Sequence, residues 1–312
     1  MIVKKNFNPI KVFSYIKYEM IYTSILAATV YYLHTNLLTE KISIPFSIAG
    51  LLGGALAIFL GFRNNTSYAR WWEARQLWSN IASSSRILAR LILTFTDSHS
   101  HQQNYVKERS ELFKKEMIYK QIAWVHSLRL NLRKENSWEE IKPLLPESEW
   151  TQLQTKTNKT GFIQFLMGQR IYKAMADGTL GGFDSFQMEG QLLSLSNYQS
   201  GCERTKDTPL LKQYDFFTRV FLVVFISVLP FTLLSELQRL NVIYLLIPIT
   251  ILISFVFTIV GKVGKVNEDP FENKITDVPL NSICNSIELE LREMLEDKNL
   301  PKKIEPVDGY LN

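Results

Sequence analysis

Four long runs without Asp, Glu, Lys or Arg constrain this chain more than any other feature. They cover residues 20–38, 42–62, 220–235 and 240–261. A helix that crosses a bilayer needs about 20 mostly apolar residues, and few soluble helices run that far without a charge. The third run is shorter, but Phe216 and Phe217 extend it past Arg219. We therefore predict four transmembrane helices; the alternative is four core helices of a soluble domain.

The runs form two hairpins, 20–62 and 216–261, with short loops at 39–41 and 236–239. Most of the basic residues near the spans lie at the ends opposite these loops: Lys4, Lys5, Lys11, Lys17, Arg63, Arg70, Arg75, Arg204, Lys206, Lys212, Arg219, Lys262 and Lys265. Because Lys and Arg accumulate on the cytoplasmic side, we expect a multi-pass protein of the cell (inner) membrane with both termini cytoplasmic. The net charge of +5 then reflects topology and contact with membrane lipids, and we expect no nucleic-acid partner.

The section between the hairpins, residues 63–215, and the tail, 262–312, are expected to be cytoplasmic and helical. Apolar residues recur at three- and four-residue steps, which predicts helices over residues 64–96, 111–133, 160–176, 182–198 and 281–296. The first of these continues the second span, and 136–158 reads as short helices and turns. No alternating β pattern occurs, so the fold class is all-α. We treat residues 1–312 as a single subunit of a membrane protein rather than as several independent domains.

The residue patterns of common enzymes and metal proteins are missing. There is no phosphate-binding glycine loop and no HExxH sequence. Cys202 and Cys284 stand in neither a CxxC pattern nor a Cys/His spacing typical of a metal site. We therefore expect no enzymatic activity, no catalytic residue, no cofactor and no metal.

Three stretches together resemble the bestrophin family, especially its bacterial branch. They are GFRNNTSYARWWEAR at 61–75, GCERTKDTPLLKQYDFF at 201–217 and NEDPFENKITDVPLNSICNSIE at 267–288. Their order relative to the four runs is that of the family. The resemblance implies a homopentamer that passes small monovalent ions through one axial pore. It also implies an apolar neck formed by the second helix and a further constriction, the aperture, in the cytosol.

The second run suits a pore helix on physical grounds. Its glycines and alanines allow close helix approach in lipid, and Ile58 and Phe62 lie one turn apart. Copies of these side chains around an axis would form apolar rings, which gate by dewetting. The alternative is that both merely pack against the third and fourth spans. The resemblance places the first neck position at Gly54, where the side chain is missing, and the aperture at Gln191.

Ion sign follows from the residues farther along the same helix. Steps of four, three and four from Phe62 reach Thr66, Ala69 and Glu73, and we expect Thr66 and Glu73 to face a cytoplasmic vestibule. A carboxylate ring favours cations, unless Arg70 or Arg75 pairs with it. This favours cation conduction, with chloride conduction close behind.

Two further expectations concern the tail and the alternative function. Animal bestrophins bind Ca²⁺ at an acidic cluster, which Lys274 and Ile275 interrupt here, so we expect no calcium gating. The alternative to a channel is a membrane transporter or a membrane-anchored signalling scaffold. Pro230 and Pro248, which are expected to interrupt spans three and four, keep the transporter open.

Overall fold

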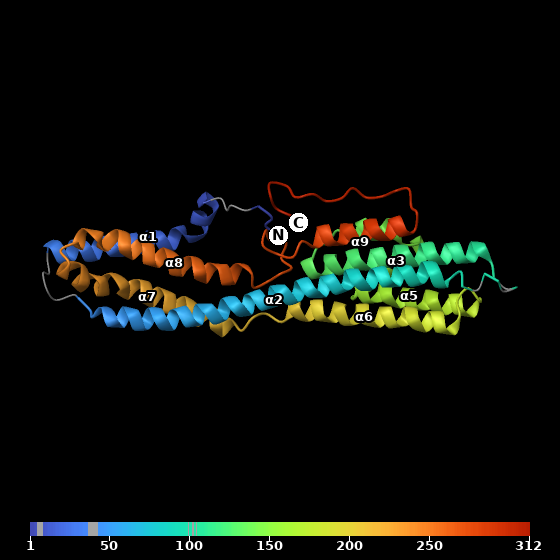
Figure 1. Cartoon of the computed structure of the whole chain (residues 1–312), viewed down its shortest axis with the longest axis horizontal. Coiled ribbons are helices and arrows are strands. Elements are labelled where there is room, and N and C mark those ends of the chain that lie inside the picture. Colours follow the sequence, from blue (N-terminus) through green and yellow to red (C-terminus); the bar gives the residue numbers. More distant parts are fainter. Residues whose placement is uncertain (5–8, 37–42, 99, 102, 104) are drawn as a thin grey trace. The chain divides into compact units, whose positions relative to one another are not determined.

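The computed structural model describes residues 1–4, 9–36, 43–98, 100–101, 103 and 105–312. Every regular element in this part of the chain is a helix, which confirms the all-α prediction (Figure 1). The elements are α1 (Pro9–Asn36), α2 (Phe46–Phe95), α3 (Lys107–Arg133), η1 (Trp138–Leu144), α4 (Glu147–Gln154), α5 (Lys159–Ala176), α6 (Gly182–Asp207), α7 (Lys212–Arg239), η2 (Ile243–Leu245), α8 (Leu246–Val266) and α9 (Leu280–Met294). The helices predicted outside the hairpins are all present, α6 being longer than expected.

The chain forms two compact units, and α2 contributes to both. We call Lys4–Trp71 with Pro209–Asp269 the apolar unit. Met1–Val3, Trp72–Thr208 and Pro270–Asn312 make up the polar unit. The unit boundary falls inside α2, between Trp71 and Trp72, nine residues after the uncharged run ends at Phe62.

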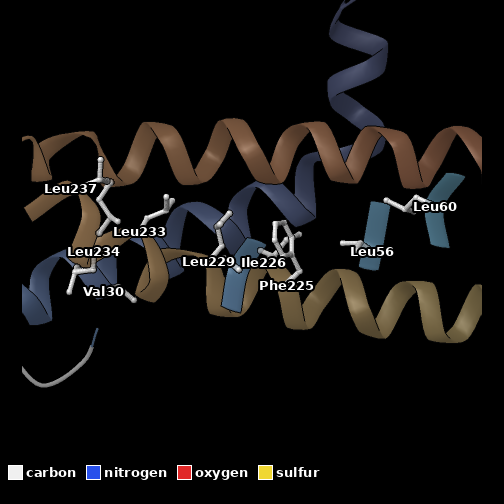
Figure 2. Packing of buried hydrophobic residues seen from close by; sticks show 11 residues of the cluster. Val30, Leu56, Leu60, Phe225, Ile226, Leu229, Leu233, Leu234 and Leu237 are labelled. Carbon is white, nitrogen blue, oxygen red and sulfur yellow. The ribbon is translucent and has the colours of Figure 1, made fainter. Parts of the chain in front are cut away.

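The apolar unit is held together by α1, α7, α8 and the first half of α2. Leucine and other apolar side chains from all four helices form one buried cluster (Figure 2). Its members are Val30, Ala49, Leu56, Leu60, Phe225, Ile226, Leu229, Leu233, Leu234, Leu237 and Leu246. The same helices carry many apolar side chains on their outer surface, such as Leu252, which is 61% exposed. Apolar surface inside and outside is typical of a membrane-embedded bundle.

Three helical stretches among the described residues are long and apolar enough to cross a membrane: Phe46–Phe95, Gly182–Arg239 and Ile243–Val266. The uncharged run of the second stretch belongs to α7. The predicted first span, in α1, is not among the three, because polar residues lower its mean hydropathy. Three of its hydroxyls are satisfied within the helix, since Thr23, Ser24 and Thr29 each donate to the carbonyl four residues earlier at 2.8 Å.

Two predictions about the hairpins are wrong. Residues 236–239 are the last turn of α7 rather than a loop, and the turn follows at Leu240. The prolines do not interrupt their spans: α7 continues through Pro230, and Pro248 lies in the first turn of α8. A first-turn N–H has no partner within the helix, so proline is tolerated there. The predicted loop 39–41 lies outside the described residues.

The polar unit is built around α3, which is buried on nearly every side. Trp124 of α3 donates to Gln199 of α6 at 3.3 Å, and Gln121 donates to Ser85 of α2 at 2.8 Å. At the α9 side, His126 bonds Glu288 at 2.9 Å. These contacts fix α2, α6 and α9 around α3 (Figure 1).

Candidate functional site

The first half of α2 has two faces of different character. Leu56 and Leu60 are each 1% exposed and belong to the buried cluster. On the opposite face, Ile58 is 61% and Phe62 66% exposed. Gly54, one turn before Ile58, would place an added Cβ with no other atom within 4 Å. The three predicted neck residues therefore share one exposed face of the helix.

Residues adjacent to Ile58 and Phe62 make the contacts with α7. Phe59 packs edge-on against Phe221, with ring centroids 5.3 Å apart, and Leu60 lies in the buried cluster. The alternative in which Ile58 and Phe62 pack against α7 and α8 is therefore not what the described part of the chain shows. Their large apolar surfaces are therefore available for contact with lipid, a pore or another copy of the chain.

Leu51 is a third large apolar side chain on the exposed face, and the sequence analysis missed it. It is 77% exposed and precedes Ile58 by seven residues, which is close to two helical turns. The signal was present in the sequence, since Leu51 and Ile58 are large apolar residues at the spacing of about two helical turns. Gly54 leaves a gap between Leu51 and Ile58.

The small residues of α2 serve two purposes. An added Cβ at Gly53 would lie 3.1 Å from Cε2 of Phe225, so this glycine lets α7 approach closely. Gly50, Gly54 and Gly61 would meet nothing within 4 Å. Close packing within the chain explains the first glycine but not the other three.

A buried arginine ties the spans together where the apolar runs end. Arg63 of α2 is 8% exposed, and its Nη2 lies 2.6 Å from Oδ1 of Asp215 and 3.5 Å from Oε2 of Glu268. Asp215 also pairs with Arg219 and, at 4.0 Å, with Lys265. Removing one partner of a buried ion pair is strongly destabilising, so this cluster is a structural anchor. From the sequence alone, these cations indicate only the orientation of the spans.

The predicted vestibule residues lie in different surroundings. Thr66 is exposed, and its hydroxyl donates to the carbonyl of Phe62 at 2.9 Å. Glu73 is not a bare carboxylate: its Oε1 accepts from Nη2 of Arg204 at 2.6 Å. Arg204 comes from α6 and was not considered as a partner in the sequence analysis.

Gln191 lies on α6 and is half-buried. Its neighbours Leu192 and Leu193 line a groove between α5 and α6, together with Phe165 and Tyr172. Gln191 itself is not among the lining residues of this groove. Gln191 and Glu73 belong to the polar unit, whereas the predicted neck residues belong to the apolar unit.

The acidic loop after α8 is occupied by contacts within the polar unit. A hydrogen bond from Lys206, 2.6 Å long, lowers the pKa of Glu272. Asp277 is buried, which raises its pKa, and its Oδ2 accepts from the backbone N–H groups of Glu272 and Lys274. Among the described residues no three His, Cys, Asp or Glu side chains come together as a metal site would require.

The arrangement of helices matches a known family. A model of the family described as Bacterial/Fungal Bestrophin protein matches residues 8–293, which is most of the chain. The chain belongs to the bestrophin family. The resemblance drawn from the three sequence stretches is thereby confirmed.

Curated relatives and solved structures extend this bestrophin assignment. One relative, from Escherichia coli K12, is named voltage-dependent anion channel-forming protein YneE; it is 34% identical over 85% of this chain and 81% of its own length. A relative from Ralstonia nicotianae with the same kind of name is 26% identical over 90% of this chain and 87% of its own. A crystal structure of a bacterial bestrophin homologue from Klebsiella pneumoniae has a TM-score of 0.81 and 27% identity, covering 91% of this chain and all of that one.

Proposed function

We propose that this bestrophin is the pore-forming subunit of an oligomeric anion channel in the cell (inner) membrane, with four spans and cytoplasmic termini. The observation that carries the proposal is the exposed apolar face of α2, in a chain whose relatives are named anion channel-forming proteins. That apolar face has to be shielded from bulk water. Lipid would gain little contact there, because Gly54 and Gly61 have no side chain. A pore axis shared by several copies, five by family resemblance, supplies that shielding.

In this proposal Leu51, Ile58 and Phe62 form apolar rings around the axis. Each ring excludes water when narrow, so the neck controls conduction by wetting rather than by charge. Gly54 widens the neck between the first two rings. Gln191 would form the aperture, the second constriction, in the cytosol.

Anion conduction replaces the cation preference expected from the sequence. The relatives' names give no support for cations, and the expected carboxylate ring is paired at Glu73 with Arg204. A paired carboxylate adds little net field at the pore.

The alternative, a transporter or a scaffold, has lost its main sequence argument. Transporters bind substrate at broken helices near the membrane midplane. Because α7 continues through Pro230 and Pro248 lies in the first turn of α8, neither proline breaks a span.

Recording purified protein in lipid bilayers under a KCl gradient tests the proposal. For the wild type, we expect a reversal potential shifted from zero toward the chloride equilibrium potential. Replacing Ile58 and Phe62 together with alanine should raise conductance or open probability, because the neck becomes wider and easier to wet. Gly54→Ile should lower both, since it adds an apolar ring.

A matched control replaces Leu252 and Val256 of α8 with alanine. These residues are also one turn apart and are 61% and 50% exposed, but on another helix. The control should conduct as the wild type does. Absence of current from well-folded wild-type protein would favour the scaffold, and a chloride-impermeant current would refute the ion sign. A neck variant identical to the wild type would remove Ile58 and Phe62 from the barrier.

A further inference from the structure

The second half of α2 carries an exposed ion pair with a helix far away in sequence. Nη2 of Arg204 lies 2.6 Å from Oε1 of Glu73, and the two side chains are 68% and 47% exposed. Both residues belong to the polar unit. Ion pairs this exposed contribute little to folding stability, so the conformational ordering of two long side chains here calls for another explanation.

Helical spacing places Glu73 on the same side of α2 as the exposed apolar residues Ile58 and Phe62, which we call the apolar stripe. It follows Phe62 by eleven residues, and at 100° per residue this is three turns plus about 20°. Glu73 therefore lies on the face of α2 that carries Ile58 and Phe62. Arg204, in the last turn of α6, reaches the same face.

Other charged groups near this end of α6 have partners of their own. Lys206 pairs with Glu272 at 2.6 Å, and Glu203 accepts from Gln199 at 2.8 Å. The Glu73–Arg204 pair has no formal net charge, but it consists of one ion of each sign with substantial exposure. Removing either residue takes away the ion that pairs with the other at 2.6 Å and changes the net charge of this site by one.

We propose that Arg204 is a selectivity-determining residue. Its guanidinium cancels the charge of the Glu73 carboxylate, which would otherwise attract cations to the face of α2 that lines the proposed pore. This inference rests on the proposed channel function and assigns to this pair the control of ion sign just past the neck. The two charges have opposite effects on the ions near them. The Glu73 carboxylate concentrates cations, the Arg204 guanidinium concentrates anions, and their pairing holds the local field near zero.

Coulomb's law gives the size of the effect. Five like charges about 10 Å from an ion in water, screened at physiological salt, change its local concentration roughly threefold. Cations and anions change in opposite directions. The chloride-to-potassium permeability ratio should therefore fall several-fold in Arg204→Gln and rise several-fold in Glu73→Gln.

The experiment measures reversal potentials in a KCl gradient for the wild type, Arg204→Gln, Glu73→Gln and the double variant. The double variant should return close to the wild-type value, because both charges are gone. Arg86→Gln is the matched control. It removes a cation from an exposed α2 pair with Glu290, 2.5 Å long and likewise in the polar unit, but on a different face of the helix. The control should leave the reversal potential unchanged.

The outcomes separate this inference from the proposed function. A wild type without current refutes the channel itself. A conducting wild type whose two single variants keep the same reversal potential refutes the role of Arg204. A shift in Arg86→Gln as large as that in Arg204→Gln also overturns it, since general surface charge would then set selectivity. Size-exclusion profiles equal to the wild type establish that the variants fold and assemble.

Discussion

Replacing Gly264 with alanine tests whether close helix contact holds the apolar unit together. An ideal Cβ at Gly264 of α8 would lie 2.1 Å from Oδ1 and 3.3 Å from Cγ of Asn64 on α2. Real Cβ contacts are not this short, so the Asn64 side chain has to move. Its Nδ2 currently donates to the carbonyl of Val260 at 3.1 Å, and this bond is lost when the side chain rotates.

The magnitude follows from three contributions. Overpacking in a tight contact costs about 1–3 kcal/mol, and the lost hydrogen bond costs about 1 kcal/mol. Alanine is favoured over glycine in a helix by about 1 kcal/mol, which offsets part of this. Gly264→Ala should therefore lower the free energy of unfolding by about 1–3 kcal/mol.

Gly261 provides a matched control on the same helix. Its added Cβ would meet Leu60 at 3.5 Å and Leu222 at 3.9 Å, which are ordinary contacts. Gly261→Ala should keep or slightly raise stability. The midpoint of thermal unfolding in mild detergent, read by intrinsic fluorescence, should differ between the two variants by on the order of 2–6 °C.

A double-mutant cycle identifies the cause. In an Asn64→Ala background the nearest remaining Asn64 atom near the new methyl group is Cα, at 3.6 Å. Gly264→Ala should then be nearly neutral, because the clashing atoms are gone. Equal midpoints for Gly264→Ala and Gly261→Ala, or no rescue by Asn64→Ala, would refute the reasoning.

Two further predictions concern the polar unit. Gly201→Ala would place Cβ 2.9 Å from Cδ2 of Leu77, so the thermal midpoint should fall by an amount equivalent to about 1–2 kcal/mol. Gly190→Ala, which meets nothing within 4 Å, should not lower it. Burial opposes ionisation of Glu288, but its contacts with His126 and Arg292 together outweigh this and lower its pKa. That stabilisation is complete above the unfolded pKa of about 4.3 and is lost as pH falls through the folded pKa, so Glu288→Gln should flatten the acid side of a midpoint-against-pH curve.

The helices could be predicted from the sequence because their signals are local. Long runs without charged residues indicate α2, α7 and α8. Apolar residues that recur every three or four positions indicate α3, α5, α6 and α9. The errors are also local in origin. Pro230 was expected to interrupt its span, yet packing of the neighbouring leucines keeps α7 helical through it. In α1, hydroxyls lower the hydropathy although those of Thr23 and Ser24 donate to carbonyls of their own helix.

The candidate site was only half predictable for a different reason. Its apolar part repeats at helical spacing, so Ile58 and Phe62 could be found, and Leu51 would have been found by extending the repeat. The partner of Glu73 could not. Arg204 lies 131 positions away in the sequence, and only the packing of α6 against α2 brings the two charges together. Arg70 and Arg75, considered instead, were candidates only because they were near in sequence.

In the proposed channel, the neck and the ion pair have separate tasks. Apolar rings at Leu51, Ile58 and Phe62 would carry no charge, so they would control whether ions pass but would not distinguish anions from cations by charge. Ion sign then depends on charged groups elsewhere along the pore. Because Glu73 and Arg204 balance each other, substituting Arg204 would leave a net negative charge and substituting Glu73 a net positive one, without altering the neck. Conduction and selectivity would therefore be separable by mutation within the single helix α2 and its contact with α6.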